Sequence, residues 1–142
     1  MSDLSGGFAL LDHPADLGIE AYGHNLAEAF EQAALGLVSI ILDSSKVDSL
    51  ESRSIILEGV DIPHLLVKWL TEILYLYDGQ GFASGGFEIS QLTPTRLEGI
   101  VHGEPYRENK HTPRLDVKAI TYHQLWVEEG STGSRLRVFL DI

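Results

Sequence analysis

The chain has 142 residues and a mass of 15.7 kDa, the size of one ordinary domain, and its 44% hydrophobic content is too high for a disordered segment. Ten Lys and Arg residues against 21 Asp and Glu residues give a formal net charge of −11, without the basic stripe expected of a protein that holds RNA by itself. The lack of cysteine excludes disulfides and zinc ribbons, and no apolar run approaches the ~20 residues of a membrane span. We therefore expect one domain over residues 1–142, a cytoplasmic location, and either cations or a basic protein surface as partners; the charge could equally serve solubility alone.

The first elements predicted along the chain are two strands. Residues 8–11 form a short apolar run that leads into a loop at residues 12–16, where Pro14 disfavours a helix through the residue before it. Apolar and other residues then alternate over residues 17–22, which is the period of a half-buried strand.

Two helices are indicated by their caps and by apolar residues at helical spacing. Asn25 can cap the first helix, with Glu28 completing a capping box, and the helix should end near Leu42. After a strand at residues 54–58, Asp61 can cap a second helix that ends at residues 78–81.

The remainder of the sequence is typical of β structure. The candidate strands are residues 87–92, 96–102, 117–122, 124–128 and 136–142, the last two joined as a hairpin about residues 130–133. A polar, irregular stretch covers residues 103–114. The fold class predicted is α+β: a single domain in which two helices pack on a largely antiparallel mixed sheet.

The first cluster of chemistry-bearing residues is Asp12-His13-Pro14-Ala15-Asp16. Two carboxylates and an imidazole on a short turn could bind a hard cation or carry out acid–base chemistry. Asp and Pro also favour turns for local reasons, which is the simpler interpretation.

The second cluster is the C-terminal end of the sequence. Leu136, Val138, Leu140 and Ile142 alternate onto one face of the last strand, and Asp141 falls on the other. If the apolar set faces the core, Ile142 anchors the last residue, and its main-chain carboxylate lies beside Asp141. A divalent cation would relieve the repulsion between these anions; the alternative is a strand that simply ends there.

The third cluster is residues 117–123. Lys118 shares a face with Ile120 and Tyr122. It could be a charged residue that keeps an edge strand from pairing with another chain, or it could contact a phosphate or a carboxylate. His123 lies on the opposite face, where it could merely bridge two strands. The sequence has no P-loop, no GxGxxG, no HExxH and no nucleophile elbow, and this argues against an ordinary hydrolase.

These three clusters, together with residues 25–31, resemble the segments that characterise the archease family, over nearly the whole chain. The resemblance implies a metal site formed by Asp16, Asp141 and Ile142. Asp12 and His13 would support the metal ligands from behind or face a partner protein, and Lys118 would support function. Calcium is the ion that the family suggests, and oxygen-only ligands would also accept Mg²⁺ or Mn²⁺. Pro14 stands where Thr is frequent in the family.

The resemblance further implies an activator of the RtcB-type RNA ligase of tRNA splicing and RNA repair, with no catalysis of its own. Such a protein promotes guanylylation and multiple turnover of the ligase and broadens the nucleotides that the ligase uses. We expect no direct nucleic-acid binding and no membrane association. Two alternatives remain open: a small metal-dependent phosphoester hydrolase that uses Asp12, His13 and Asp16, and a chaperone-like interaction module.

Overall fold

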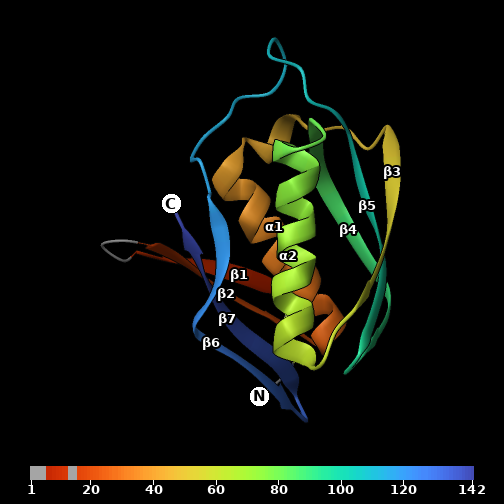
Figure 1. The fold of residues 1–142 in the computed structure, drawn as a ribbon, viewed down its shortest axis with the longest axis vertical. Helices are drawn as coiled ribbons and strands as arrows, with labels where there is room; N and C mark the ends of the chain where they lie inside the picture. Colours follow the sequence, from red (N-terminus) through yellow and green to blue (C-terminus); the bar gives the residue numbers. More distant parts are fainter. Residues whose placement is uncertain (1–5, 13–15) are drawn as a thin grey trace.

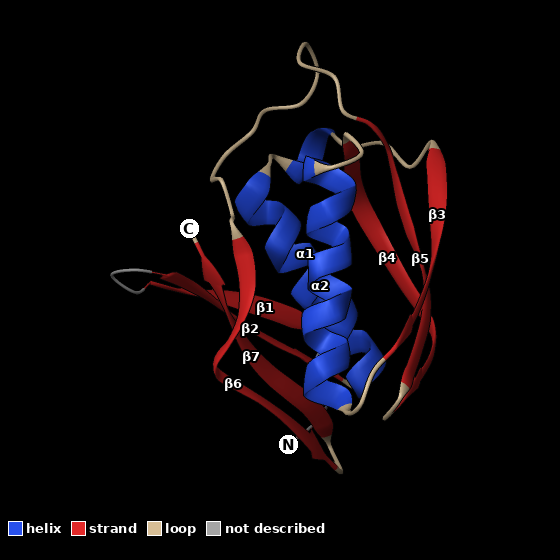
Figure 2. Cartoon of the chain, viewed as in Figure 1, coloured by secondary structure: helices blue, strands red, loops and turns tan. Residues whose placement is uncertain are grey.

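The structure is a computed structural model, and it describes residues 6–12 and 16–142. In these residues, seven strands form two separate antiparallel sheets, and two α-helices lie between them (Figures 1 and 2). The predicted α+β class with two helices on antiparallel strands is confirmed, although the strands divide into two sheets, in which every pairing is antiparallel.

The four-stranded sheet combines the two ends of the sequence. Its order is β1-β2-β7-β6, so that the second strand of the chain pairs with the last. The bounds are Gly7–Asp12 for β1, Asp16–Gly23 for β2, Ala119–Gly130 for β6 and Gly133–Asp141 for β7.

The three-stranded sheet and the helices come from the middle of the chain. The sheet has the order β3-β5-β4. Its strands are β3 (Glu51–Glu58), β4 (Phe82–Thr93) and β5 (Arg96–Pro105), and the helices are α1 (Leu26–Ile41) and α2 (Ile62–Asp78), with a short 3₁₀ turn, η1, at Ser44–Lys46. Within the described residues, neither helix is long and apolar enough to cross a membrane.

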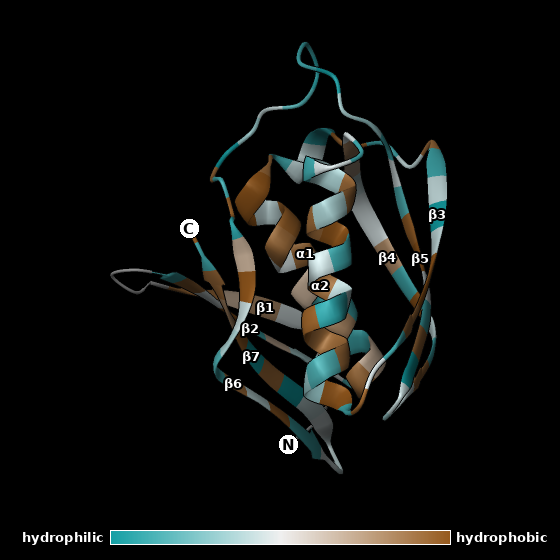
Figure 3. Ribbon diagram, in the orientation of Figure 1, coloured by the Kyte–Doolittle hydropathy of each residue, from teal (hydrophilic) through white to brown (hydrophobic). Residues whose placement is uncertain are grey.

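One hydrophobic core fills the space between the sheets, and both helices contribute to it. Figure 3 shows apolar residues recurring along the helices and along the strands that face them. Trp69 of α2 is fully buried at its centre, where its indole Nε1 donates a 3.0 Å hydrogen bond to the Phe30 carbonyl oxygen of α1. Its ring meets Phe87 of β4 edge to face at 6.0 Å. Because its polar atom is satisfied, this large side chain contributes its full apolar area to the core.

The helix caps predicted from the sequence are confirmed, with one difference in detail. The Asn25 side chain accepts a 2.8 Å hydrogen bond from the Glu28 N–H, and Asp61 accepts one of 2.9 Å from the His64 N–H. The Glu28 carboxylate accepts a 2.6 Å hydrogen bond from the N–H of His24, whereas in a capping box it would accept one from the N–H of Asn25. The cap therefore extends one residue further before α1.

The predicted strands differ from the observed ones by a few residues at their ends, and the largest differences are in β6 and β4. The strands predicted at residues 117–122 and 124–128 are one strand, β6, which begins at Ala119 and whose pairing with β7 is interrupted between Thr121 and Trp126. The strand expected from residue 87 begins at Phe82, so Gly85 and Gly86 are part of β4. The predicted hairpin between β6 and β7 is confirmed, with Gly130 opposite Gly133.

Close packing of β4 on β5 gives a test of the three-stranded sheet. A Cβ atom at Gly103 would overlap the carbonyl oxygen of Ala83, whereas one at Gly86 would lie 3.5 Å from the Cβ of His102, an ordinary contact. Gly103→Ala should therefore lower the free energy of unfolding by about 1–3 kcal/mol, because backbone must move to accommodate the methyl group.

Urea denaturation of Gly103→Ala and of the control Gly86→Ala measures this difference. We expect the control to stay within about 1 kcal/mol of the wild type. Equal effects of the two substitutions would contradict the close approach of the strands at Gly103.

Candidate metal centre

Three segments that are far apart in the sequence meet at one end of the four-stranded sheet. Asp16 begins β2 and pairs in register with Asp141, which ends β7. On the other side of β7, Ala119 pairs with Asp141, and the Lys118 N–H donates a 2.8 Å hydrogen bond to the Asp141 carbonyl oxygen. The sheet therefore brings together Asp16, Asp141 and Lys118 from the three predicted clusters.

The two aspartates lie on the same face of the sheet, directed away from the helices. In an antiparallel pair, residues in register project to the same side, with Cβ atoms about 4.5–5.5 Å apart. The next pair along, Leu17 and Leu140, is buried in the core at 8% and 0% exposure, so Asp16 and Asp141 face outward. Asp16 is half-buried and Asp141 is exposed.

This arrangement sets two like charges directly opposite each other, which destabilises a strand pair unless a cation lies between them. The donors available are carboxylate and main-chain oxygens, and these fit Ca²⁺, Mg²⁺ or Mn²⁺ in preference to softer metals. Within residues 6–12 and 16–142, no three His, Cys, Asp or Glu side chains gather in a way that could hold a metal ion. The predicted site would thus take side-chain ligands from Asp16 and Asp141 and a further donor from the main chain of Ile142.

The anchoring of the C-terminal strand differs from the prediction. Ile142 does not continue the buried row, because its side chain is 41% exposed. The strand is held instead by Leu140 in the core and by the hydrogen bond from the Lys118 N–H to Asp141. The prediction that the Ile142 side chain anchors the last residue is therefore wrong, and main-chain pairing performs that function.

The prediction for the third cluster is correct only in part. Ile120 is 9% exposed and faces the core, but Lys118 is exposed and Tyr122 is 57% exposed. The alternation fails on both sides of Ile120, because Lys118 lies just before β6 begins and because β6 leaves its register after Thr121, with Gln124 in a left-handed backbone at φ of 53°.

The irregular part of β6 covers an aromatic ring next to the two aspartates. The ring of His123 lies 6.4 Å from that of Phe139, which is only 3% exposed although it projects outward. Gly18 stands opposite Phe139, and a Cβ there would collide with the ring. Phe139 thus fills the space that the glycine leaves, and it lies in the next outward-facing residue pair after Asp16 and Asp141.

The structure describes only part of the first predicted cluster. His13, with its neighbours at 14–15, lies outside the described residues. Asp12 ends β1, and its backbone pairs with Leu17 of β2. Its strand position is therefore at the same end of the sheet as Asp16.

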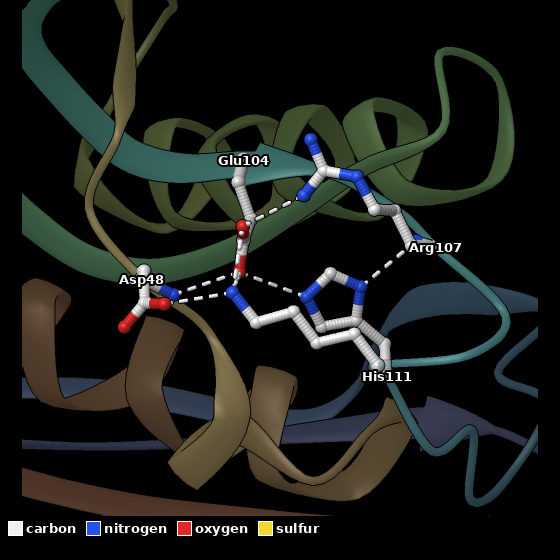
Figure 4. A network of polar contacts seen from close by, with 5 residues as sticks. Asp48, Glu104, Arg107 and His111 are labelled. Atoms are coloured by element: carbon white, nitrogen blue, oxygen red, sulfur yellow. Dashed lines mark hydrogen bonds and ion pairs between the residues drawn. The ribbon is translucent and has the colours of Figure 1, made fainter.

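The sequence did not reveal a buried polar network around Glu104, which Figure 4 shows. This carboxylate is fully buried and accepts hydrogen bonds from the Asp48 N–H at 2.9 Å, from Lys110 Nζ at 2.9 Å and from His111 Nε2 at 3.0 Å, with Arg107 at 3.2 Å. The Asp48 N–H, then Lys110 and His111, lower the pKa of Glu104 to about 2. The donors come from two separate connections, so no spacing in the sequence identifies the network.

The network fixes the first part of the connection between β5 and β6, and this connection leads to Lys118. Further along, the N–H groups of Arg114 and Leu115 donate to the Ile41 and Ile40 carbonyl oxygens at 2.9 and 3.0 Å, and so satisfy the C-terminal end of α1. Val117, only 2% exposed, then enters the core just before Lys118. The position of Lys118 beside Asp141 therefore depends on contacts made by residues 104–117.

Comparison with known proteins identifies relatives over nearly the whole chain. The model of the Archease protein family (MTH1598/TM1083) matches residues 8–142. Proteins named archease from Saccharolobus islandicus and Sulfurisphaera tokodaii are 44% and 38% identical over 137 and 139 residues, which is 95% of this chain and 98% of each relative.

Two solved structures have similar folds. The solution structure of Methanobacterium thermoautotrophicum protein 1598 has a TM-score of 0.80 at 33% identity and covers 96% of this chain and 99% of its own. The crystal structure of a Thermotoga maritima archease, described as a possible chaperone, has a TM-score of 0.66 at 19% identity, covering 93% of this chain and 94% of its own, and supports the fold alone.

The buried carboxylate predicts a specific acid sensitivity. Because the pKa of Glu104 is lowered from 4.5 to about 2 in the folded protein, its contribution to stability is complete above pH ~4.5 and is lost as the pH falls towards 2. Glu104→Gln should lower Tm at pH 7 and should flatten the fall of Tm between pH 4.5 and 2.

Differential scanning calorimetry across this pH range measures both effects. The control is Glu98→Gln, which removes a carboxylate from an exposed pair with Arg96 and should leave the slope close to that of the wild type. An unchanged slope in Glu104→Gln would show that this carboxylate is not the group that titrates.

Proposed function

The chain belongs to the archease family, and from this membership and the geometry of the strand ends we propose that it activates an RtcB-type RNA ligase without catalysis of its own. In this proposal the protein promotes guanylylation and multiple turnover of the ligase, and broadens the nucleotides that the ligase uses. The process served is tRNA splicing or RNA repair, in the cytoplasm. Substrate RNA is bound by the ligase and not by this chain.

The observation that carries the proposal is the meeting of Asp16, Asp141 and Lys118 at one end of the sheet. These residues come from three of the four segments that resemble the family, and they form no contiguous motif in the sequence. Burial of Leu17 and Leu140 fixes the register, so the two carboxylates are held opposite each other before any ligand arrives. A site that is ordered in advance loses little conformational entropy on binding.

We propose that a divalent cation, Ca²⁺ in preference to Mg²⁺ or Mn²⁺, binds between Asp16, Asp141 and the main-chain carboxylate of Ile142. Calcium accepts six to eight oxygen ligands in flexible geometry at ~2.3–2.6 Å, which suits a site formed at a strand end. When bound, the cation supplies positive charge to a face that the two carboxylates otherwise make negative. Asp12 and His13 would lie behind this site or face the partner.

The charge of the chain supports a protein partner. A net charge of −11 repels RNA but attracts the basic surface with which a ligase holds RNA and nucleotide. Lys118 is exposed beside Asp141, where it can contact a carboxylate or phosphate of the assembled complex.

Two other functions remain as outcomes of the experiments below. One is a chaperone-like interaction module, which would suppress aggregation without a metal; possible chaperone is also the description given to the Thermotoga maritima relative. A phosphoester hydrolase that uses Asp12, His13 and Asp16 would instead turn over a generic phosphate ester by itself.

Multiple-turnover RNA ligation tests the proposed activation. Catalytic amounts of the wild-type protein, added to the purified ligase of the same organism with Mn²⁺ and GTP, should convert a single-turnover reaction into many turnovers. Asp16→Asn should reduce the rate to that of the ligase alone, because the cation loses a charged ligand, while the fold is retained as judged by circular dichroism. Full stimulation by Asp16→Asn would contradict the metal-site mechanism.

Thermal unfolding in Ca²⁺ tests the site without the ligase. At a Ca²⁺ concentration of 100 times the Kd, binding should add about 2.7 kcal/mol to the free energy of unfolding, a rise in Tm of roughly 10 °C. Asp141→Asn and a Gly-Ser extension after Ile142 should each abolish this rise. Asp61→Asn, which keeps a capping side chain on α2, serves as the matched control and should retain it. A full rise in the extended protein would exclude the Ile142 carboxylate as a ligand.

A further inference from the structure

The outer face of the four-stranded sheet carries two rows of side chains beyond the aspartates. Strand register places Glu20, Arg137 and Trp126 in one row across β2, β7 and β6. Tyr22, Arg135 and Glu128 form the next row. This face therefore combines aromatic and arginine side chains, the residue types that dominate the energetics of protein interfaces.

The first row is held rigidly before any partner binds. Arg137 donates from Nε and Nη2 to one oxygen of Glu20, at 3.0 and 2.6 Å. On its other side, the guanidinium lies 5.6 Å from the centre of the Trp126 ring. Trp126 is nevertheless 36% exposed, so a large apolar surface is fixed in place and remains accessible. A side chain fixed in this way loses little entropy when it is covered.

A hollow lies beside this row. Its volume is about 210 Å³, and its lining includes Ala9, Glu20, Tyr22, Trp126 and Arg135. This size suits one inserted side chain and is below the ~300–1,000 Å³ of a typical small-molecule pocket.

One exposed cation, Arg135, lies beside the hollow. Arg135 is exposed and forms no ion pair in the described part of the chain, although Glu128 stands opposite to it. The Glu20–Arg137 pair is neutral in itself. Most other basic side chains are engaged internally; these are Arg53, Lys68, Arg96, Arg107, Lys110 and Arg114. Arg135 is thus a cation placed beside an exposed tryptophan in an otherwise acidic protein.

We propose that this outer face is the surface on which the ligase docks, with an apolar side chain of the ligase in the hollow beside Trp126 and a ligase carboxylate on Arg135. This inference rests on the proposed function and specifies where the partner binds. Arg137 precedes Asp141 by four residues of the same strand, a span of ~13 Å. A standard interface covers about 800 Å² on each partner, enough to include both the hollow and the aspartates.

Binding of purified ligase, measured by isothermal titration calorimetry in Ca²⁺, tests the surface. Trp126→Ala and Arg135→Glu should each raise the Kd at least tenfold, and the effect of Arg135→Glu should shrink at high salt. Trp126→Phe, which keeps a ring, should raise the Kd less than Trp126→Ala. Arg135→Glu changes only an exposed side chain and should not disturb the fold, so a weaker affinity in this variant cannot be attributed to misfolding.

Two controls lie elsewhere on the surface. Lys46→Glu reverses the charge of an exposed cation outside the sheet, and Tyr75→Ala removes an aromatic ring that is 51% exposed on α2. Both should change the Kd less than twofold.

The outcomes separate this inference from the proposed function. If the wild type stimulates the ligase but Arg135→Glu and Trp126→Ala bind as tightly as it does, the docking surface is wrong and the activation stands. If binding depends on Trp126 and Arg135 but ligation is not stimulated, the surface stands and the activator function is wrong. Binding of an RNA oligonucleotide that requires both residues, with ligase affinity unchanged, would assign the face to RNA and overturn the inference.

Discussion

The pairing of β2 with β7 is the constraint on which the rest of this structure depends. It joins the beginning of the sequence to its end, and it places the four-stranded sheet across one side of the helices (Figure 1). A slip of β2 by one residue against β7 would turn Leu17 out of the core and Asp16 into it. The burial of these leucines therefore determines which face the carboxylates occupy.

The placement of the helices between two sheets leaves each sheet with one covered face and one free face. The free face of the four-stranded sheet has the two aspartates at one end and the Trp126–Arg137–Glu20 row further along. Phe139, covered by His123 and opposite Gly18, lies between them. Functional side chains on a rigid sheet are positioned more precisely than on a loop, and here the core that fixes the sheet also fixes the candidate site.

The network around Glu104 shows how an irregular connection acquires a defined course. A fully buried carboxylate is costly unless each oxygen accepts hydrogen bonds, and Glu104 obtains them from a backbone N–H and from the side chains of Lys110, His111 and Arg107. The same connection then satisfies the last carbonyl groups of α1. A polar segment without regular structure therefore brings Lys118 to the end of β7 through hydrogen bonds and not through a strand of its own.

The sequence by itself determined the local structure: the caps at Asn25 and Asp61, the apolar periodicity of both helices and the hairpin between β6 and β7 were all read correctly, because each depends on neighbours along the chain. It also identified the three segments of the candidate site. Only the tertiary structure decided that the strands form two sheets and that Asp16 lies opposite Asp141. It likewise decided that Ile142 is exposed and that Glu104 is buried. Strand partners and buried hydrogen bonds join residues that are remote in the chain, so a local pattern indicates which residues form a strand or a site but not which of them meet.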